Sequence, residues 1–276
     1  MTVAIVTDSA AALPPDLARR HGVTVVPMWL SIRGEPVLEG ERSLEDLLAE
    51  EQVTTSAPTP GEWERAVKGG LEGAEGVLVL TIAGSMSATY QSALVAAEAV
   101  GGPVRVVDSA TAAGAEALVV LAAAETAQQG ATLDVVEARA RHVIDRVRLV
   151  ATLPNLDHLV RGGRVPGIAG WAGRRLGINP LFEFRGGKVH RLRPALSPEA
   201  ASDRMVGLVR RSHVEGARLH VVALHALALD TAQRLLDRVE EQFAPATSFV
   251  SEFGPVMVVH TGPGLAGLAW WWDSTT

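Results

Sequence analysis

The stretch VLVLTI at residues Val77–Ile82 is a short apolar run of the kind that forms a buried strand. Residues Ser87–Val100 are predicted to form a helix that ends at Gly101-Gly102, because glycine is favoured at the end of a helix. A second apolar run, Val104–Val107, comes next. Two strands joined by a helix in this way are predicted to run parallel, because only a long crossover returns the chain to the same end of a sheet.

The same alternation extends toward both ends of this unit. Val3–Val6 is a further apolar run, and Pro14-Pro15-Asp16 then opens a predicted helix through Arg20. Val23–Leu30 is predicted to be one strand. Further helices are predicted over residues 61–68, 112–129 and 133–147. Residues 1–150 are therefore predicted to form an α/β domain, a Rossmann-like parallel sheet flanked by helices.

The regular alternation of predicted strands and helices ends near Val150. Phe182–Leu192 alternates apolar and polar residues about Gly186-Gly187, which predicts a β-hairpin. Helices are predicted over residues 153–160, 198–213 and 230–243, and strands over residues 219–224, 247–253 and 256–259. Hairpins mixed with helices are typical of an α+β domain with a mixed sheet, which we assign to residues 151–276.

Composition narrows the class of protein. The 276 residues are 47% hydrophobic, which is sufficient for a substantial core. The net charge of −6 argues against nucleic-acid binding, since no cationic excess can neutralise phosphates. Cysteine is absent, which excludes disulfides and thiolate chemistry. The apolar stretch Ala117–Ala124 is too short to span a membrane, and the N-terminus has no signal-peptide pattern, so we expect a cytoplasmic protein.

Three polar segments stand at the ends of structured runs and offer hydroxyl and imidazole groups. They are Thr54-Thr55-Ser56, Ser85–Thr89 with Ser87 at its centre, and His260. His260 follows the predicted strand Val256–Val259 and precedes a glycine-rich loop, which would place the imidazole at a sheet edge within reach of a ligand. This mixture suits binding of a small anion better than bond cleavage. The same residues can instead form turns, and a serine can cap the helix that follows it.

Ser87 and His260 also admit an alternative interpretation as the catalytic pair of an acyl hydrolase, although the G-x-S-x-G elbow is missing. His220 and His225 lie five residues apart on a predicted strand and face opposite sides, so no metal site is expected. Residues 262–267 match G-x-G-x-x-G but lack the context of dinucleotide binding, so no cofactor is expected. Arg164 lies in a glycine turn, either solvated or available to a carboxylate, a phosphate or a partner.

Seven short motifs occur in a fixed order along the chain. They are Val6-Thr7-Asp8-Ser9, Thr54-Thr55-Ser56, Ser87–Ala93, Val107-Asp108-Ser109, Gly162-Gly163-Arg164-Val165, Ile178-Asn179-Pro180 and His260–Gly264. Each motif is weak alone, but the ordered set resembles the DegV family of bacterial fatty-acid-binding proteins over essentially the whole chain.

The resemblance implies a non-enzymatic carrier that buries a long-chain fatty acid between its two domains. It also implies a partner, a separate fatty acid kinase that converts the bound carboxylate into an acyl phosphate for phospholipid synthesis, and it is compatible with transient contact with a membrane surface. By matching position, Thr55, Ser56, Ser87 and His260 would bind the carboxylate. Arg164 would lie at the mouth, where it contacts the acyl head or the kinase.

Overall fold

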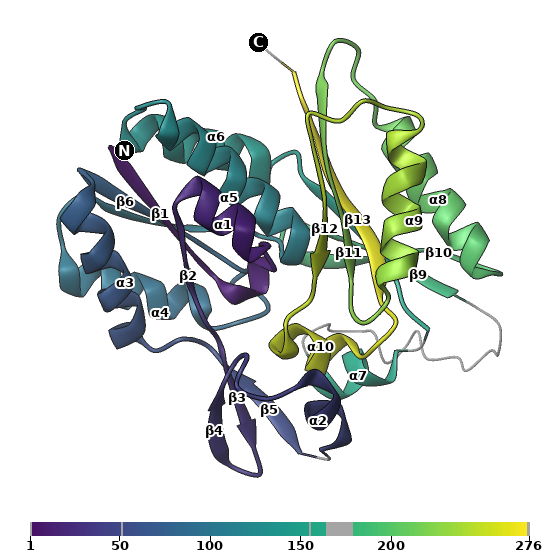
Figure 1. Cartoon of the computed structure of the whole chain (residues 1–276), viewed down its shortest axis with the longest axis horizontal. Coiled ribbons are helices and arrows are strands. Elements are labelled where there is room, and N and C mark those ends of the chain that lie inside the picture. The colour runs from purple at the N-terminus through teal and green to yellow at the C-terminus, as the bar shows by residue number, and fades with distance from the viewer. Residues whose placement is uncertain (1, 51, 155, 164–178, 275–276) are drawn as a thin grey trace.

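The computed structural model describes residues 2–50, 52–154, 156–163 and 179–274 and holds two main sheets and a smaller third one (Figure 1). A mixed α/β architecture with one parallel sheet and a separate mixed sheet confirms the predicted fold class. The two main sheets pack on opposite sides of helix α5 (Ala113–Gln128). Among the helices described, none is long and apolar enough to cross a membrane.

The first sheet consists of the strands that the sequence predicts to be parallel. Its order is β2-β1-β6-β7, all parallel, with β1 (Val3–Asp8), β2 (Val23–Val26), β6 (Gly76–Thr81) and β7 (Val104–Asp108). In β6, Val79 packs toward α3 (Pro60–Gly73) and α4 (Thr89–Val100), whereas Leu80 faces α5, because successive strand residues point to opposite faces. Helices therefore cover both faces of this sheet (Figure 1).

The helices of the first half occur where the sequence predicts them, with shifted ends. They are α1 (Pro15–His21), α3, α4, α5 and α6 (Leu133–Ile144). Pro60 at the first position and a capping box between Thr59 and Glu62 start α3, which runs beyond its predicted end at residue 68. Ala88 occupies the N-cap position of α4, and the serine before it, Ser87, accepts the N–H of Thr89, the first residue of the helix.

The first half of the chain also forms a small antiparallel sheet that the sequence does not predict. Its order is β4-β3-β5, with β3 (Trp29–Ile32), β4 (Glu35–Leu38) and β5 (Val53–Ser56), and helix α2 (Leu44–Ala49) precedes β5. The predicted single strand Val23–Leu30 is wrong, because Pro27, which has no N–H to continue a ladder, separates β2 from β3. Thr55 and Ser56 belong to β5, so they lie in a strand rather than in a turn.

The second sheet has six strands in the order β10-β9-β8-β13-β11-β12. They are β8 (Arg148–Thr152), β9 (Asn179–Arg185), β10 (Lys188–Ala195), β11 (Arg218–His225), β12 (Thr247–Glu252) and β13 (Ala266–Asp273). β11 and β12 pair in parallel and the other pairs are antiparallel, so the sheet is mixed, and β9 and β10 form the predicted hairpin. One face packs on α8 (Pro198–Arg211) and α9 (Leu229–Glu240), and the other packs on α5.

Several parts of the second half differ from the prediction. Residues Pro255–Thr261 form helix α10, so the predicted strand Val256–Val259 is wrong. Pro255 favours the helix start, where its missing N–H costs little. Strands β8 and β13 are missed by the prediction, and helix α7 (Asp157–Gly162) begins later than predicted. The predicted domain boundary at residue 150 lies within β8, and the division into two domains stays a prediction.

Helix α5 is buried on all sides. Thirteen of its sixteen residues are buried, and alanine, valine and leucine surround most of the helix. It packs on β1 of the first sheet and on β11 of the second sheet. A Cβ atom at Gly114 would lie 2.8 Å from Cγ1 of Val222 in β11, so only a glycine allows this close approach. α5 therefore joins both sheets into one core.

Replacing Gly114 with valine is expected to lower the free energy of unfolding by about 2 kcal/mol, because the added side chain overfills the contact with Val222. Urea unfolding followed by circular dichroism measures the change. Gly69→Val in α3 is the matched control, since nothing lies within 4 Å of a Cβ atom at that position. Equal stability of the two variants would contradict the close packing of α5 on β11.

Candidate functional site

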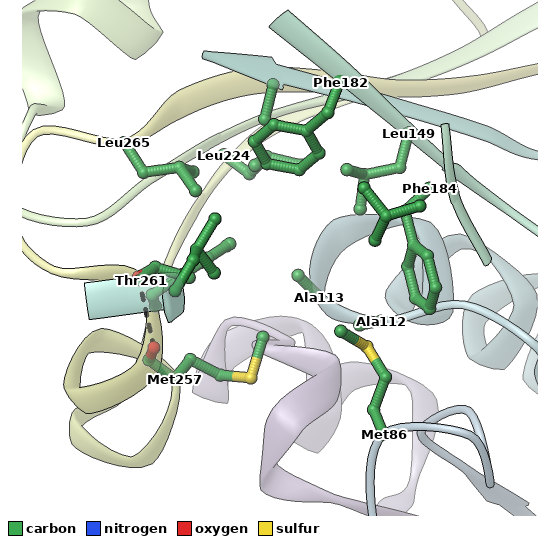
Figure 2. A pocket seen from close by; sticks show the side chains of 14 residues that line it. Met86, Ala112, Ala113, Leu149, Phe182, Phe184, Leu224, Met257, Thr261 and Leu265 are labelled. Carbon is green, nitrogen blue, oxygen red and sulfur yellow. Dashed lines mark hydrogen bonds between the residues drawn. The ribbon is translucent and has the colours of Figure 1, made fainter. Parts of the chain in front are cut away.

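An apolar cavity lies between α5, α10 and the second sheet (Figure 2). The space free of protein atoms is about 500 Å³, which includes open solvent at its mouth. It is lined by Met86, Ala112, Ala113, Leu149, Ala151, Leu159, Phe182, Phe184, Val189, Leu224, Phe253, Met257, Thr261 and Leu265. Thr261 has the one polar side chain among these described residues, and its hydroxyl donates to the backbone carbonyl of Met257 at 3.1 Å. Such walls suit an aliphatic chain.

The secondary structure explains how these side chains reach the cavity. Phe182 and Phe184 are two residues apart in β9 and therefore share the face that looks toward α5. Ala113, at the start of α5, is small and leaves the space that a larger side chain would fill. Figure 2 shows Met86 and Met257 extending toward one another across one side of the cavity. Flexible thioether side chains of this kind adapt to ligands of different shape.

A polar pair involves α10, the helix that contributes Met257 and Thr261 to the cavity wall. Oγ1 of Thr55 and Nε2 of His260 are 2.7 Å apart, although 205 residues separate them in the sequence. His260 lies in the last turn of α10, directly before the lining residue Thr261, and Thr55 comes from β5. A Cβ atom at Gly162 would lie 2.9 Å from Nδ1 of His260, so this glycine at the end of α7 makes room for the imidazole.

Ser87 lies beside the cavity, because it directly follows the lining residue Met86. Its half-buried hydroxyl is 2.7 Å from Oγ1 of Thr89 and accepts the backbone N–H of Thr89 at 3.3 Å. The hydrogen bonds described thus pair Ser87 with a threonine, and Nε2 of His260 with another threonine. They do not form the serine–histidine pair that an acyl hydrolase needs.

The structure does not bring Ser56 to this polar pair. Ser56 is exposed, and as the strand neighbour of Thr55 it points to the opposite face of the small sheet. Its role in carboxylate binding stays a prediction. Arg164 lies outside the described residues, so its predicted position at the mouth also stays a prediction.

Glu39, which the sequence analysis does not single out, positions α10. The Oε1 atom of Glu39 accepts the N–H of Val256 in the first turn of α10 at 3.1 Å, and its Oε2 atom accepts the hydroxyl of Ser9. Ser9 in turn accepts the N–H of Met28 at 3.0 Å. Burial raises the pKa of Glu39, and these donors oppose that shift. Glu39 therefore holds the start of the helix whose last turn carries His260, a role with no local sequence signal.

The chain is similar to known proteins over nearly its full length. The family model described as "Uncharacterised protein, DegV family" matches residues 2–272. A DegV domain-containing protein of Streptomyces coelicolor is 35% identical, and the match covers 96% of this chain and 97% of that protein. The solved structure of a fatty-acid-binding DegV family protein from Thermus thermophilus is 30% identical, with a TM-score of 0.91 and coverage of 99% and 100%. A DegV lipid-binding protein from Thermotoga maritima is 27% identical, with a TM-score of 0.88 and full coverage of both chains.

Buried carboxyl groups lie behind the site, at the carboxyl edge of the parallel sheet. Asp8 accepts the N–H groups of Ala10 and Ile82, each at 2.9 Å, so it caps turns at this edge. Burial raises the pKa of Asp8 to about 7, although both backbone donors lower it. Glu116 of α5 is also fully buried. Among the described residues, no group of three or more histidine or acidic side chains is placed to hold a metal ion.

Glu116 is incompletely satisfied in this environment. Its Oε1 atom accepts the hydroxyl of Thr7 at 3.3 Å, whereas its Oε2 atom has no hydrogen-bond partner among the described residues. Burial, followed by repulsion from Asp8, holds the pKa of Glu116 well above its usual value. The neutral acid is therefore the form that the folded protein favours.

We expect Glu116→Gln to stabilise the protein more at pH 8 than at pH 5. The folded wild type retains this proton where the unfolded chain releases it, so the folded state binds more protons, and stability falls as pH rises above the ordinary pKa of 4.5. Glutamine cannot ionise and avoids this loss. Urea unfolding of both proteins at the two pH values measures the difference.

Glu125→Gln is the matched control for this prediction, because Glu125 is a less buried carboxyl on the same helix. It is expected to show no comparable gain at pH 8. A gain from Glu116→Gln that is equal at pH 5 and pH 8, or that Glu125→Gln shares, would contradict the assignment of Glu116 as the group with the raised pKa.

Proposed function

Because this chain belongs to the DegV family, we propose that it binds a long-chain fatty acid in the apolar cavity, with the carboxylate beside Thr55 and His260. The proposal rests on a cavity with apolar walls and on a polar pair that includes His260, the chain neighbour of the lining residue Thr261. Similar proteins that bind fatty acids support it. A ligand with an aliphatic body and one acidic end matches this division of the site.

The hydrocarbon tail supplies most of the affinity. Each buried CH₂ group contributes about 0.8 kcal/mol, so a long chain contributes on the order of 10 kcal/mol before the costs of association. Phe182 and Phe184 provide rigid apolar surface, while Met86 and Met257 adjust to the shape of the chain. The tail therefore needs no specific polar contact.

The carboxylate requires donors, because burying an unpaired charge is costly. When Nε2–H of His260 donates to Oγ1 of Thr55, the threonine hydroxyl proton remains available to the carboxylate. The same logic applies to Ser87, whose own proton is available when Oγ1 of Thr89 donates to it. A protonated His260 would strengthen the contact through a charge-assisted hydrogen bond. These groups hold an anion without activating a nucleophile.

We also propose that the protein acts as a carrier of the fatty acid. The protein presents the bound carboxylate to a separate fatty acid kinase, which forms an acyl phosphate for phospholipid synthesis. Thr55 and His260 are half-buried rather than fully buried, so the acidic end of the ligand lies nearer to the surface than its tail. A carboxylate in this position is accessible to a second protein, whereas the tail remains protected from water.

Purified protein is expected to carry about one long-chain fatty acid per chain, because the walls of the cavity are apolar and favour burial of a hydrocarbon tail. Organic extraction followed by mass spectrometry identifies and counts the acid. Delipidated protein should take up hexadecanoate with the same stoichiometry. Absence of co-purified acid together with absence of hexadecanoate uptake would contradict the proposed function.

Thr55→Val is expected to weaken fatty acid binding about tenfold, because it removes the hydroxyl donor from the carboxylate while preserving the size of the side chain. Calorimetric titration of delipidated protein with hexadecanoate measures the change. Thr54→Val is the matched control, since Thr54 is exposed on the opposite face of the same strand and should bind normally. Hexadecanol, which lacks the carboxylate, should bind Thr55→Val and wild type equally.

Two results would contradict this assignment of the head-group site. One is equal weakening by Thr54→Val and Thr55→Val, and the other is unchanged binding by Thr55→Val.

With a fatty acid kinase and ATP, wild type should support acyl phosphate formation, and Ser87→Ala should support it poorly. A serine-directed fluorophosphonate that labels wild type but not Ser87→Ala would favour an acyl hydrolase instead of a carrier.

A further inference from the structure

A second hollow lies on the opposite face of the second sheet, between the β9–β10 hairpin and α8. Its empty volume is about 670 Å³. It is lined by Leu181, Leu192, Arg193, Arg204, Leu208 and Arg211. Leu181 lines this hollow, whereas its strand neighbour Phe182 lines the first cavity, so the sheet separates the two spaces.

The three arginines of the hollow lack acidic partners. Among the described residues, none of Arg193, Arg204 and Arg211 forms an ion pair. Asp203, the acid next to Arg204 in the chain, pairs with Arg238 of α9. Residues 183–211 contain seven lysines and arginines against three acidic residues, although the whole chain has a net charge of −6. This concentration of positive charge is therefore local.

Backbone contacts hold one of these guanidinium groups in place, and a glycine leaves space for a second. Nη1 of Arg204 donates to the backbone carbonyls of Arg193 and Pro194 in β10. Nη1 of Arg211 lies 3.2 Å from the position that a Cβ atom of Gly207 would occupy, so this glycine gives the guanidinium its space. Because Arg204 is ordered by these contacts, it loses less conformational entropy when it binds an anion than a free surface arginine does.

We propose that this hollow binds a second, small amphiphilic anion, a phosphate or carboxylate group on a short apolar body. The arginine guanidinium groups match such oxyanions because their N–H donors form paired hydrogen bonds with two oxygens. Leu181, Leu192 and Leu208 contact the apolar body. This hollow is separate from the fatty acid cavity, so a result against anion binding in the hollow would leave the proposed function unaffected.

The test is calorimetric titration of the full-length protein with hexyl phosphate, after saturation with hexadecanoate so that the first cavity is filled. One saturable site is expected, and Arg211→Gln should weaken it at least about tenfold. Arg210→Gln is the matched control, because Arg210 is exposed on the same helix but does not line the hollow. Inorganic phosphate should bind at least about tenfold more weakly than hexyl phosphate, since it lacks the apolar body.

Three results would overturn the proposal. They are the absence of saturable hexyl phosphate binding, equal weakening by Arg210→Gln and Arg211→Gln, and equal affinity for inorganic phosphate and hexyl phosphate. Hexanoate distinguishes the two head groups: affinity equal to or above that of hexyl phosphate supports a carboxylate ligand, and lower affinity supports a phosphate ligand. Circular dichroism of each variant verifies that it is folded, and the exposed Arg211 should be replaceable without unfolding.

Discussion

The packing of one apolar helix between two sheets is the constraint on which this structure depends. α5 has no polar face to turn toward water, so it is stable only when both sheets cover it. Its small residues allow that: Gly114 brings the helix against Val222, and one continuous core results. The cavity lies where α5 begins, beside Ala112 and Ala113. The contact that joins the sheets therefore also bounds the space for a ligand.

The small antiparallel sheet and the residue that follows β4 hold the short helix at one wall of this cavity. Glu39, directly after β4, contacts α10 at its first turn, and Thr55 of β5 contacts it at its last turn. Both contacts fix the orientation of a helix that is only seven residues long and that would not be stable in isolation. Because α10 also carries Met257 and Thr261, the same contacts set one wall of the cavity. The Thr55–His260 contact and the shape of the cavity are thus linked through one short helix.

The carboxyl edge of a parallel sheet is the usual place for a ligand in α/β proteins. Here two acids at that edge serve the backbone instead. Asp8 accepts two N–H groups, and Asp108 accepts those of Ala110 and Gly84 at 2.7 and 3.1 Å. Such capping satisfies donors that would otherwise be buried without partners. The apolar cavity lies farther out, between this edge and the second sheet, and none of its described lining residues is acidic.

The sequence by itself determined the elements with unambiguous periodicity: the parallel strands, the long helices, the β9–β10 hairpin and the polar segments that contain Thr55, Ser87 and His260. The tertiary structure decided the rest. A short run such as Val256–Val259 suits a buried strand or a buried helix equally well, and here Glu39, 217 residues away, stabilises the helix by accepting the N–H of Val256. The Thr55–His260 contact likewise joins distant segments. Local patterns cannot specify such contacts, because chain folding alone brings these partners together.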